Sequence, residues 1–259
     1  MYQHLNFQNK EGIVRISLNR PHVHHALNKE LIKEITLAIE VAASDEEVRA
    51  VLLTAEGDTA FCSGADLKDT LDSKIDVDQT LREYYNPMIM AIRSLPKPVV
   101  CRLNGLAVGA GASLALSCDM VVATESAYLA FMFVQIGLMP DAGATFILPR
   151  LVGSARAFAL ASTGQRVTAR EAQHIGMIAH AVPASELDST VEKLLLYYRH
   201  APTQAIAAMK QVLNQSQHSS LEQMLDLERI HQHQLSKTTD AKNGISSFLQ
   251  KKKPDYQGK

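Results

Sequence analysis

Residues 97–119 read KPVVCRLNGLAVGAGASLALSCD, and this stretch combines the signals of a strand, a tight turn and a helix. Its segment Pro98–Leu103 is apolar and rich in valine, which predicts a buried strand. A turn of small residues, Asn104–Ala112, leads into a helical segment that ends near Cys118. A strand joined to a helix in this way is the unit from which the parallel sheets of α/β proteins are built.

The sequence before and after this stretch repeats the alternation of strand and helix. Ile13–Leu18 and Ala50–Ala55 are rich in Val, Ile and Leu and predict strands, and Met120–Ala123 predicts a further one. Between the first two, Asn28 is a good N-cap for a helix. Apolar residues follow it at helical spacing, namely Leu31, Ile32, Ile35 and Ile39. The fold class is therefore predicted as α/β with a largely parallel sheet.

From about residue 153 onward the sequence predicts helices and no further strands. Thr168 and Glu171 match a capping box, and Ser185 is a candidate N-cap for the next helix. Pro202 suits the first turn of another. The last third of the chain is therefore expected to be helical.

The segments 220–236 and beyond Asp240 continue this helical pattern. We expect a sheet-based core over residues 1–200 and a helical C-terminal region over 201–259. No low-complexity linker separates the two parts, which favours one continuous domain.

The composition argues against several classes of protein. With 46% hydrophobic and 20% charged residues and a net charge of −1, the chain lacks the basic excess of a nucleic-acid-binding protein. Cys62, Cys101 and Cys118 form no CxxC pair, which favours free thiols in a reducing compartment. The N-terminal residues lack a signal-peptide pattern, and no apolar run approaches the roughly 18–20 residues that cross a bilayer. We expect a soluble cytoplasmic protein with no nucleic acid and no membrane as partner.

Two turns of small residues are candidate ligand-binding sites. The first is Phe61–Lys68 (FCSGADLK), and the second is Asn104–Ala112. Small residues let a ligand approach the backbone, and the start of a helix presents unpaired N–H groups that suit a developing oxyanion. Tight packing of strand on helix would also explain either turn. The glycines match neither the G-x-G-x-x-G dinucleotide pattern nor a P-loop.

Asp141 is the candidate acid or base. It is the one charged residue between Tyr128 and Leu148 and lies in the turn Gly137–Thr145. An apolar neighbourhood would raise the pKa of its carboxyl toward values useful for proton transfer. The alternative is that Asp141 caps the helix that follows it.

Five ordered motifs resemble the crotonase, or enoyl-CoA hydratase/isomerase, superfamily. The similarity is collinear, and it covers nearly the whole chain. The motifs are LNRPxxxxALN (18–28), FCSGADLKD (61–69), KPVVCRLNGLAVGAGASLALSCD (97–119), GLMPDAGATFILPRLVG (137–153) and EAQHIGMI (171–178). Among the branches of this superfamily, the pattern is most similar to that of the epoxyphenylacetyl-CoA isomerases.

The resemblance implies a crotonase-like fold of repeated ββα units, with a helical C-terminal region that builds a trimer or a dimer of trimers. It implies an oxyanion hole formed by the backbone N–H groups of Ala65 and Ala110. It implies no metal and no separate cofactor, because coenzyme A enters as part of the substrate. The residues that it places at the acyl-coenzyme A are His24, Ala26, Ser63, Ala65, Asp66, Leu67, Lys68, Phe133, Phe248 and Lys251.

The sequence departs from the family pattern at the two glutamates that the family's hydratases use. Ser113 and Phe133 stand at these positions, which argues against the usual hydration mechanism. Asp141 matches a carboxylate used by a subset of the isomerases. We therefore expect an enoyl-CoA isomerase in which Asp141 takes up and returns the proton.

Other interpretations remain open. A hydratase could use Asp141 and a bound water, and the ending FLQKKKPDYQGK (248–259) is similar to that of methylglutaconyl-CoA hydratases. In a dehalogenase branch the matching aspartate is a nucleophile, a chemistry that needs an aromatic cradle, and this chain has no Trp. A catalytically silent acyl-CoA-binding homologue is the alternative of another class. Tyr84 and Tyr85 are candidate residues of the acyl pocket, and Cys62 is expected to be a packing cysteine.

Overall fold

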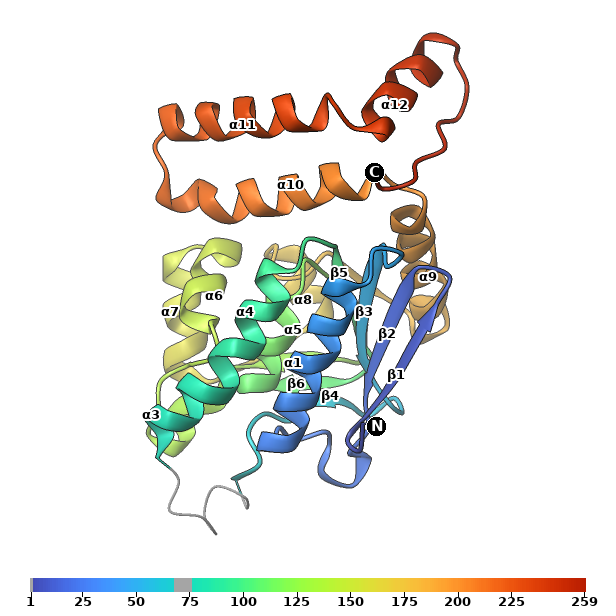
Figure 1. The fold of residues 1–259 in the computed structure, drawn as a ribbon. Helices are drawn as coiled ribbons and strands as arrows, with labels where there is room; N and C mark the ends of the chain where they lie inside the picture. Colours follow the sequence, from blue (N-terminus) through green and yellow to red (C-terminus); the bar gives the residue numbers. More distant parts are fainter. Residues whose placement is uncertain (1, 68–75) are drawn as a thin grey trace.

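The computed structural model describes residues 2–67 and 76–259, and two sheets form its framework (Figure 1). The larger sheet has the strand order β1 (Leu5–Lys10), β2 (Ile13–Leu18), β3 (Ala50–Ala55), β5 (Val99–Leu103), β7 (Met120–Thr124) and β10 (His180–Val182). The smaller sheet has the order β4 (Ala60–Cys62), β6 (Leu106–Val108), β8 (Tyr128–Ala130) and β9 (Arg166–Thr168). The pairs β1–β2 and β8–β9 are antiparallel, and the other pairs are parallel.

The chain repeats one ββα step, as predicted. In β3–β4, β5–β6 and β7–β8, the first strand joins the larger sheet and the second joins the smaller one. The helices α4 (Asn86–Ser94), α5 (Ala110–Ser117) and α6 (Ala144–Val152) follow these three pairs. The repetition stacks equivalent strand ends above one another, which places the residues that follow β4 and β6 side by side.

The larger sheet is covered on both faces, which is why its central strands are almost continuously apolar. In β3, Val51 and Leu53 belong to the main core, whereas Leu52 packs with α9 (Ala184–Arg199). The main core also holds the inner face of α1 (Lys29–Ser44), whose first turn is capped by Asn28 through a 3.0 Å hydrogen bond from the Leu31 amide.

Shorter elements complete the structure. They are α3 (Val77–Thr80), a π-helical turn (Leu81–Tyr85), α7 (Ser154–Thr163), α8 (Ala169–His174), and the 3₁₀ turns Pro21–Val23, Met132–Ile136 and Ser216–His218. The Thr168 side chain caps α8 by accepting from the Glu171 amide, as predicted, but the return bond of a capping box, from the Thr168 amide to the Glu171 side chain, is not found in the described part of the chain.

Two predictions for the C-terminal third are wrong. β9 and β10 are strands beyond residue 153, but three residues each are too few to show a strand periodicity. Ser185 is not an N-cap, because α9 already begins at Ala184. Pro183 holds the cap position, with an extended backbone that suits the residue before a helix.

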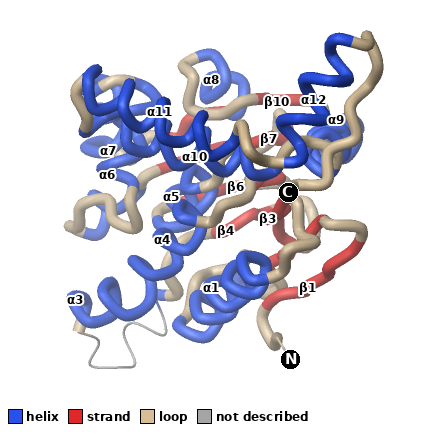
Figure 2. The backbone as a smooth tube through the Cα atoms, turned by 45° about the horizontal axis from the view of Figure 1, so that its top comes forward, coloured by secondary structure: helices blue, strands red, loops and turns tan. Residues whose placement is uncertain are grey.

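The helices α10 (Thr203–Gln215) and α11 (Leu221–Leu235) lie side by side across one end of the core, and α12 (Thr239–Leu249) extends beyond them (Figures 1 and 2). Lys210 ties α10 to the core, since its Nζ lies 2.7 Å from Asp119 Oδ2. The division of the chain at residues 200 and 201 stays a prediction. In the part of the chain that the structure describes, no helix is long and apolar enough to cross a membrane.

Candidate active site

The two turns of small residues meet at the ends of β4 and β6, which pair in parallel. Gly64 has a φ of +98°, and a Cβ built on it would lie 2.8 Å from Val108 O and 3.5 Å from Ala110 N. A Cβ on Gly111 would lie 2.3 Å from Cys62 O. Glycine is therefore required at both positions, because any side chain would push the two turns apart.

The backbone around Ala65 is held by Leu27. The Leu27 amide donates to Gly64 O at 2.7 Å, and Leu27 O accepts from the Asp66 amide at 3.0 Å. In a parallel bridge of this kind the central residue, Ala65, points its own N–H away from the partner strand. Within residues 2–67 and 76–259, the Ala65 amide donates to no protein group.

Ala110 is the first residue of α5, and Gly109 precedes it with a φ of +53°. The first amides of a helix have no acceptor within the helix, and the helix dipole adds a partial positive charge there. The Gly109 amide is used in a 2.8 Å hydrogen bond to Ala130 O. The Ala110 amide, in contrast, donates to no group of the described residues, so it is available to a ligand.

A cavity of about 320 Å³ brings these two turns together with Asp141. Its lining includes Ala65, Ala110 and Asp141. Most of the remaining lining is apolar and includes Val77, Leu81, Tyr85, Met132, Phe133, Ile136 and Leu138. Tyr85 is thus a lining residue as predicted, whereas Tyr84 lies outside this lining, with Lys29 and Lys33 over its ring.

The Asp141 carboxyl is poorly solvated, and one of its two oxygens is unpaired. Its Oδ1 is buried without a hydrogen-bond partner among the described residues, and burial raises the pKa of Asp141 to about 6. The side chain does not cap α6, because Gly143 holds the N-cap position there without any side-chain hydrogen bond. The backbone carbonyl of Asp141 accepts two hydrogen bonds, from Ser113 Oγ and from the Ala144 amide, both at 3.0 Å.

The two positions that carry glutamate in the family's hydratases both lie at this site. Phe133 lines the cavity and is 8% exposed, with its ring 3.9 Å from the position of a Cβ on Gly109. Ser113 is fully buried beneath the start of α5. Of the described lining residues, Asp66 and Asp141 are the carboxylates, and Asp66 is paired with Arg20 at 3.0 Å.

The residues predicted to contact coenzyme A divide into three groups. Those that line the cavity are Ser63, Ala65, Asp66, Leu67 and Phe133. His24 and Ala26 lie on the adjoining loop, where the Ser63 amide donates to His24 O at 3.0 Å and Arg20 donates to Ala26 O. Phe248 and Lys251, at the end of α12, do not line the cavity of their own chain, and Phe248 is 83% exposed. Lys68 lies outside the described residues.

The loop before α1 contains a polar network that sequence reasoning missed. His25 is 2% exposed, its Nδ1 accepts from the Arg20 amide at 3.0 Å, and its Nε2 lies 3.0 Å from Glu56 O. The ion pair of Arg20 with Asp66 holds the residue next to Ala65. The LNRP motif carries Arg20, but only the folded chain shows which carboxylate it pairs with.

Cys62 is a packing residue, as predicted. Its thiol donates to His25 O at 3.2 Å, and complete burial raises the pKa of Cys62 to about 12. A thiol that stays protonated at neutral pH is a poor nucleophile. In the described ranges, no group of three or more His, Cys, Asp or Glu side chains is arranged to hold a metal ion.

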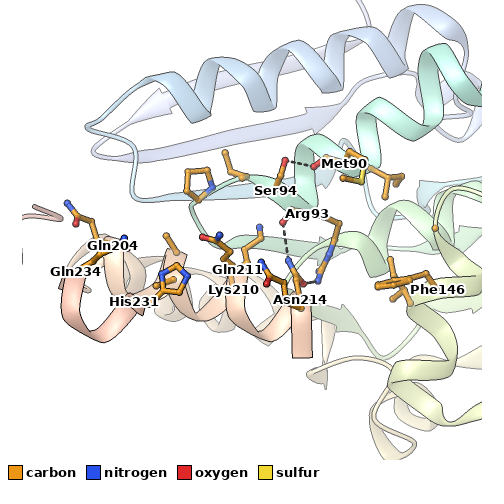
Figure 3. Close-up of a pocket in the computed structure, with 18 of the residues that line it drawn as sticks. Met90, Arg93, Ser94, Phe146, Gln204, Lys210, Gln211, Asn214, His231 and Gln234 are labelled. Atoms are coloured by element: carbon orange, nitrogen blue, oxygen red, sulfur yellow. Dashed lines mark hydrogen bonds between the residues drawn. The ribbon is translucent and has the colours of Figure 1, made fainter. Parts of the chain in front are cut away.

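A larger cavity of about 850 Å³ lies between α4, α6, α10 and α11 (Figure 3). Two of its polar side chains are already bound: Asn214 Nδ2 donates to Arg93 O at 3.2 Å, and Lys210 pairs with Asp119. Neither small-residue turn borders it. The smaller cavity is therefore the candidate active site, because the free amides and the unpaired carboxyl are found there.

The fold and this cavity define a class of protein: an α/β protein of repeated ββα units whose ligand cavity holds two available backbone amides and a desolvated carboxyl group. The enoyl-CoA hydratase/isomerase family model matches residues 8–259. The chain belongs to this family, and thus to the crotonase superfamily.

Individual relatives carry the names of different activities. The 1,2-epoxyphenylacetyl-CoA isomerase of Escherichia coli (strain K12) is 36% identical over 96% of this chain and 97% of its own length. A Rhodobacter capsulatus protein named "Probable enoyl-CoA hydratase" is 39% identical over 100% of this chain and 99% of its own. The crystal structure of an enoyl-CoA hydratase from Bacillus anthracis superimposes with a TM-score of 0.93 at 30% identity, covering 99% of this chain and all of that one.

Proposed function

We propose that this protein is an enoyl-CoA isomerase in which Asp141 is the general acid and base. In this proposal the backbone amides of Ala65 and Ala110 bind the thioester oxygen of the substrate. The observation that carries it is the carboxyl of Asp141, which lies in the same cavity as the two amides, with one oxygen buried and unpaired and its pKa raised to about 6.

The chemistry follows from this arrangement. The Asp141 carboxylate removes a proton from one carbon of the acyl group, and the electron pair moves onto the thioester oxygen as an enolate. Two fixed N–H donors stabilise that charge, and one such donor contributes about 3 kcal/mol to lowering a barrier. The protonated Asp141 then returns the proton two carbons away, so that the double bond shifts and the enzyme is restored. A pKa near 6 suits both steps, because the group must give up its proton as readily as it takes one.

Isomerisation is favoured over hydration by the side chains present. Hydration of the usual kind needs one group to activate water and another to deliver a proton, and Ser113 and Phe133 supply neither. A hydratase that uses Asp141 with a bound water is the second candidate, and the hydratase name of the Rhodobacter capsulatus relative favours it. Asp66, the other carboxylate of the described lining, is paired with Arg20 at 3.0 Å, which keeps this candidate in second place.

The substrate is an acyl-CoA thioester, and no cofactor is needed for proton transfer. Phe248 and Lys251 lie outside the cavity of their own chain, so contacts from them to coenzyme A would come from a neighbouring subunit. Figures 1 and 2 place α12 at the opposite end of the folded molecule from α3, which borders the cavity. This separation supports the predicted trimer or dimer of trimers. A cytoplasmic location is proposed from the free thiols alone.

The test is incubation with 2-enoyl, 3-enoyl and arylacetyl-epoxide CoA thioesters in heavy water, followed by mass spectrometry and NMR of the products. Migration of a double bond with deuterium at the α-carbon supports the isomerase. Addition of water supports the hydratase instead. Binding of the thioesters without exchange or turnover would contradict both and favour a binding role.

A further inference from the structure

Ser113 links the two halves of the candidate active site. It lies in the first turn of α5, the helix that begins with Ala110, and its side chain is fully buried. Its Oγ is 3.0 Å from the carbonyl oxygen of Asp141 and 3.4 Å from that of Gly109. A hydroxyl has one proton to donate, and the shorter contact, to Asp141, is the stronger hydrogen bond.

The segment that carries Asp141 needs such support. Ala142 has a φ of +48°, a backbone conformation that residues other than glycine adopt only at a cost in energy. One oxygen of the Asp141 carboxyl, Oδ1, has no partner among the described residues, and the carboxyl accepts a hydrogen bond from the backbone amide of Asp141 itself. Its place in the cavity is therefore set through the backbone, where the bonds from Ser113 Oγ and the Ala144 amide meet at one carbonyl.

We propose that Ser113 is a positioning residue that fixes the Asp141 carboxyl relative to the Ala65 and Ala110 amides. The inference rests on the proposed function and deepens it. Ser113 touches no substrate atom in this account. It joins the helix that supplies one amide to the turn that supplies the acid, so that both face one bound thioester at a fixed separation. Without this bond, the strained turn at Ala142 is free to relax and the carboxyl to move toward water.

Ser117 provides a matched control. It lies in the last turn of the same helix, is also fully buried, and donates locally to Leu114 O at 2.6 Å. Ser117→Ala and Ser113→Ala each remove one buried hydroxyl and one hydrogen bond from α5. They differ in that Ser113 alone reaches the segment of Asp141.

The experiment compares the full-length wild type, Ser113→Ala and Ser117→Ala in the isomerase assay across pH. We expect Ser113→Ala to lower kcat by roughly 10- to 100-fold, because misplacing a catalytic group by a fraction of an ångström to 1 Å has effects of this size. KM should stay within about twofold, since the acyl-CoA contacts are untouched. The acid limb of kcat/KM should move to lower pH, because a carboxyl that turns toward water loses the burial that raises its pKa.

Ser117→Ala should keep the wild-type kcat and the wild-type acid limb. If both variants have the same kcat and the same pH profile, the positioning role of Ser113 is contradicted. A wild type without isomerase activity would instead contradict the proposed function, so the two failures are distinguishable. If Ser113→Ala does not fold, Ser113→Cys replaces it: its thiol is a weaker donor, so kcat should fall less but in the same direction, and a kcat and a pH profile equal to those of Ser117→Ala would contradict the positioning role.

Discussion

Replacing Gly64 by alanine should separate the two turns that form the site. The new Cβ would lie 2.8 Å from Val108 O, so the turns must move apart by about 0.6 Å to reach the 3.4 Å at which ordinary contacts begin. The Ala110 amide, 3.5 Å from the same Cβ, moves with Val108. Because a misplacement of about 1 Å can lower a rate about 100-fold, we expect kcat to fall by roughly 10- to 100-fold.

The stability effect of this change has two parts that a control separates. Alanine at a φ of +98° costs about 1–3 kcal/mol in backbone strain, and the clash adds a comparable amount. Gly57 has a φ of +77° but nothing within 4 Å of its Cβ position. Gly57→Ala should therefore show strain alone in urea unfolding and retain wild-type kcat. If Gly64→Ala keeps a kcat within about twofold of that of Gly57→Ala, the convergence of the two turns on the substrate is refuted.

Three further predictions follow from the same structure. The rate constant kcat/KM should rise with pH through about 6 as the Asp141 base ionises, and a flat pH–rate profile between pH 5 and pH 8 would exclude it as the base. Asp141→Asn should raise the free energy of unfolding by about 1–2 kcal/mol at pH 8 but hardly at pH 4. The reason is that a carboxyl whose pKa is raised in the folded state destabilises that state once it ionises. Urea unfolding at both pH values measures the difference. Asp240→Ala should lower the free energy of unfolding by about 1–3 kcal/mol, because the buried carboxylate accepts from the amides of Gln257 at 2.7 Å and Gly258 at 2.8 Å. An unchanged midpoint of urea unfolding would show that this contact contributes nothing to stability.

The long, strongly patterned elements could be predicted from the sequence alone. The bounds of β2 and β3 agree with Ile13–Leu18 and Ala50–Ala55, because most residues of both strands are buried, which gives the strands a clearly apolar composition. Asn28 marked the start of α1, because an N-cap is a local interaction. The three-residue strands of the smaller sheet, β9 among them, were missed because they are held by pairing with distant neighbours.

The candidate site could be predicted in its parts but not in its connections. The glycine pattern indicated both turns, and the lack of other charges near Asp141 indicated a raised pKa. The hydrogen bond of Ser113 to the Asp141 carbonyl could not be foreseen, since it joins residues 28 apart whose backbones meet only after folding. From the sequence, Ser113 was notable only because the resembling hydratases have a glutamate at this position.

In the proposed mechanism Asp141 moves the proton while the backbone amides hold the thioester. The direct test is double-bond migration of a 3-enoyl-CoA thioester by Asp141→Asn at pH 8 in heavy water, with coenzyme A thioester affinity measured by calorimetry on the same protein. We expect the affinity to stay within about threefold of the wild type while migration and deuterium incorporation fall at least about 1,000-fold. Migration at a rate near that of the wild type would contradict this mechanism.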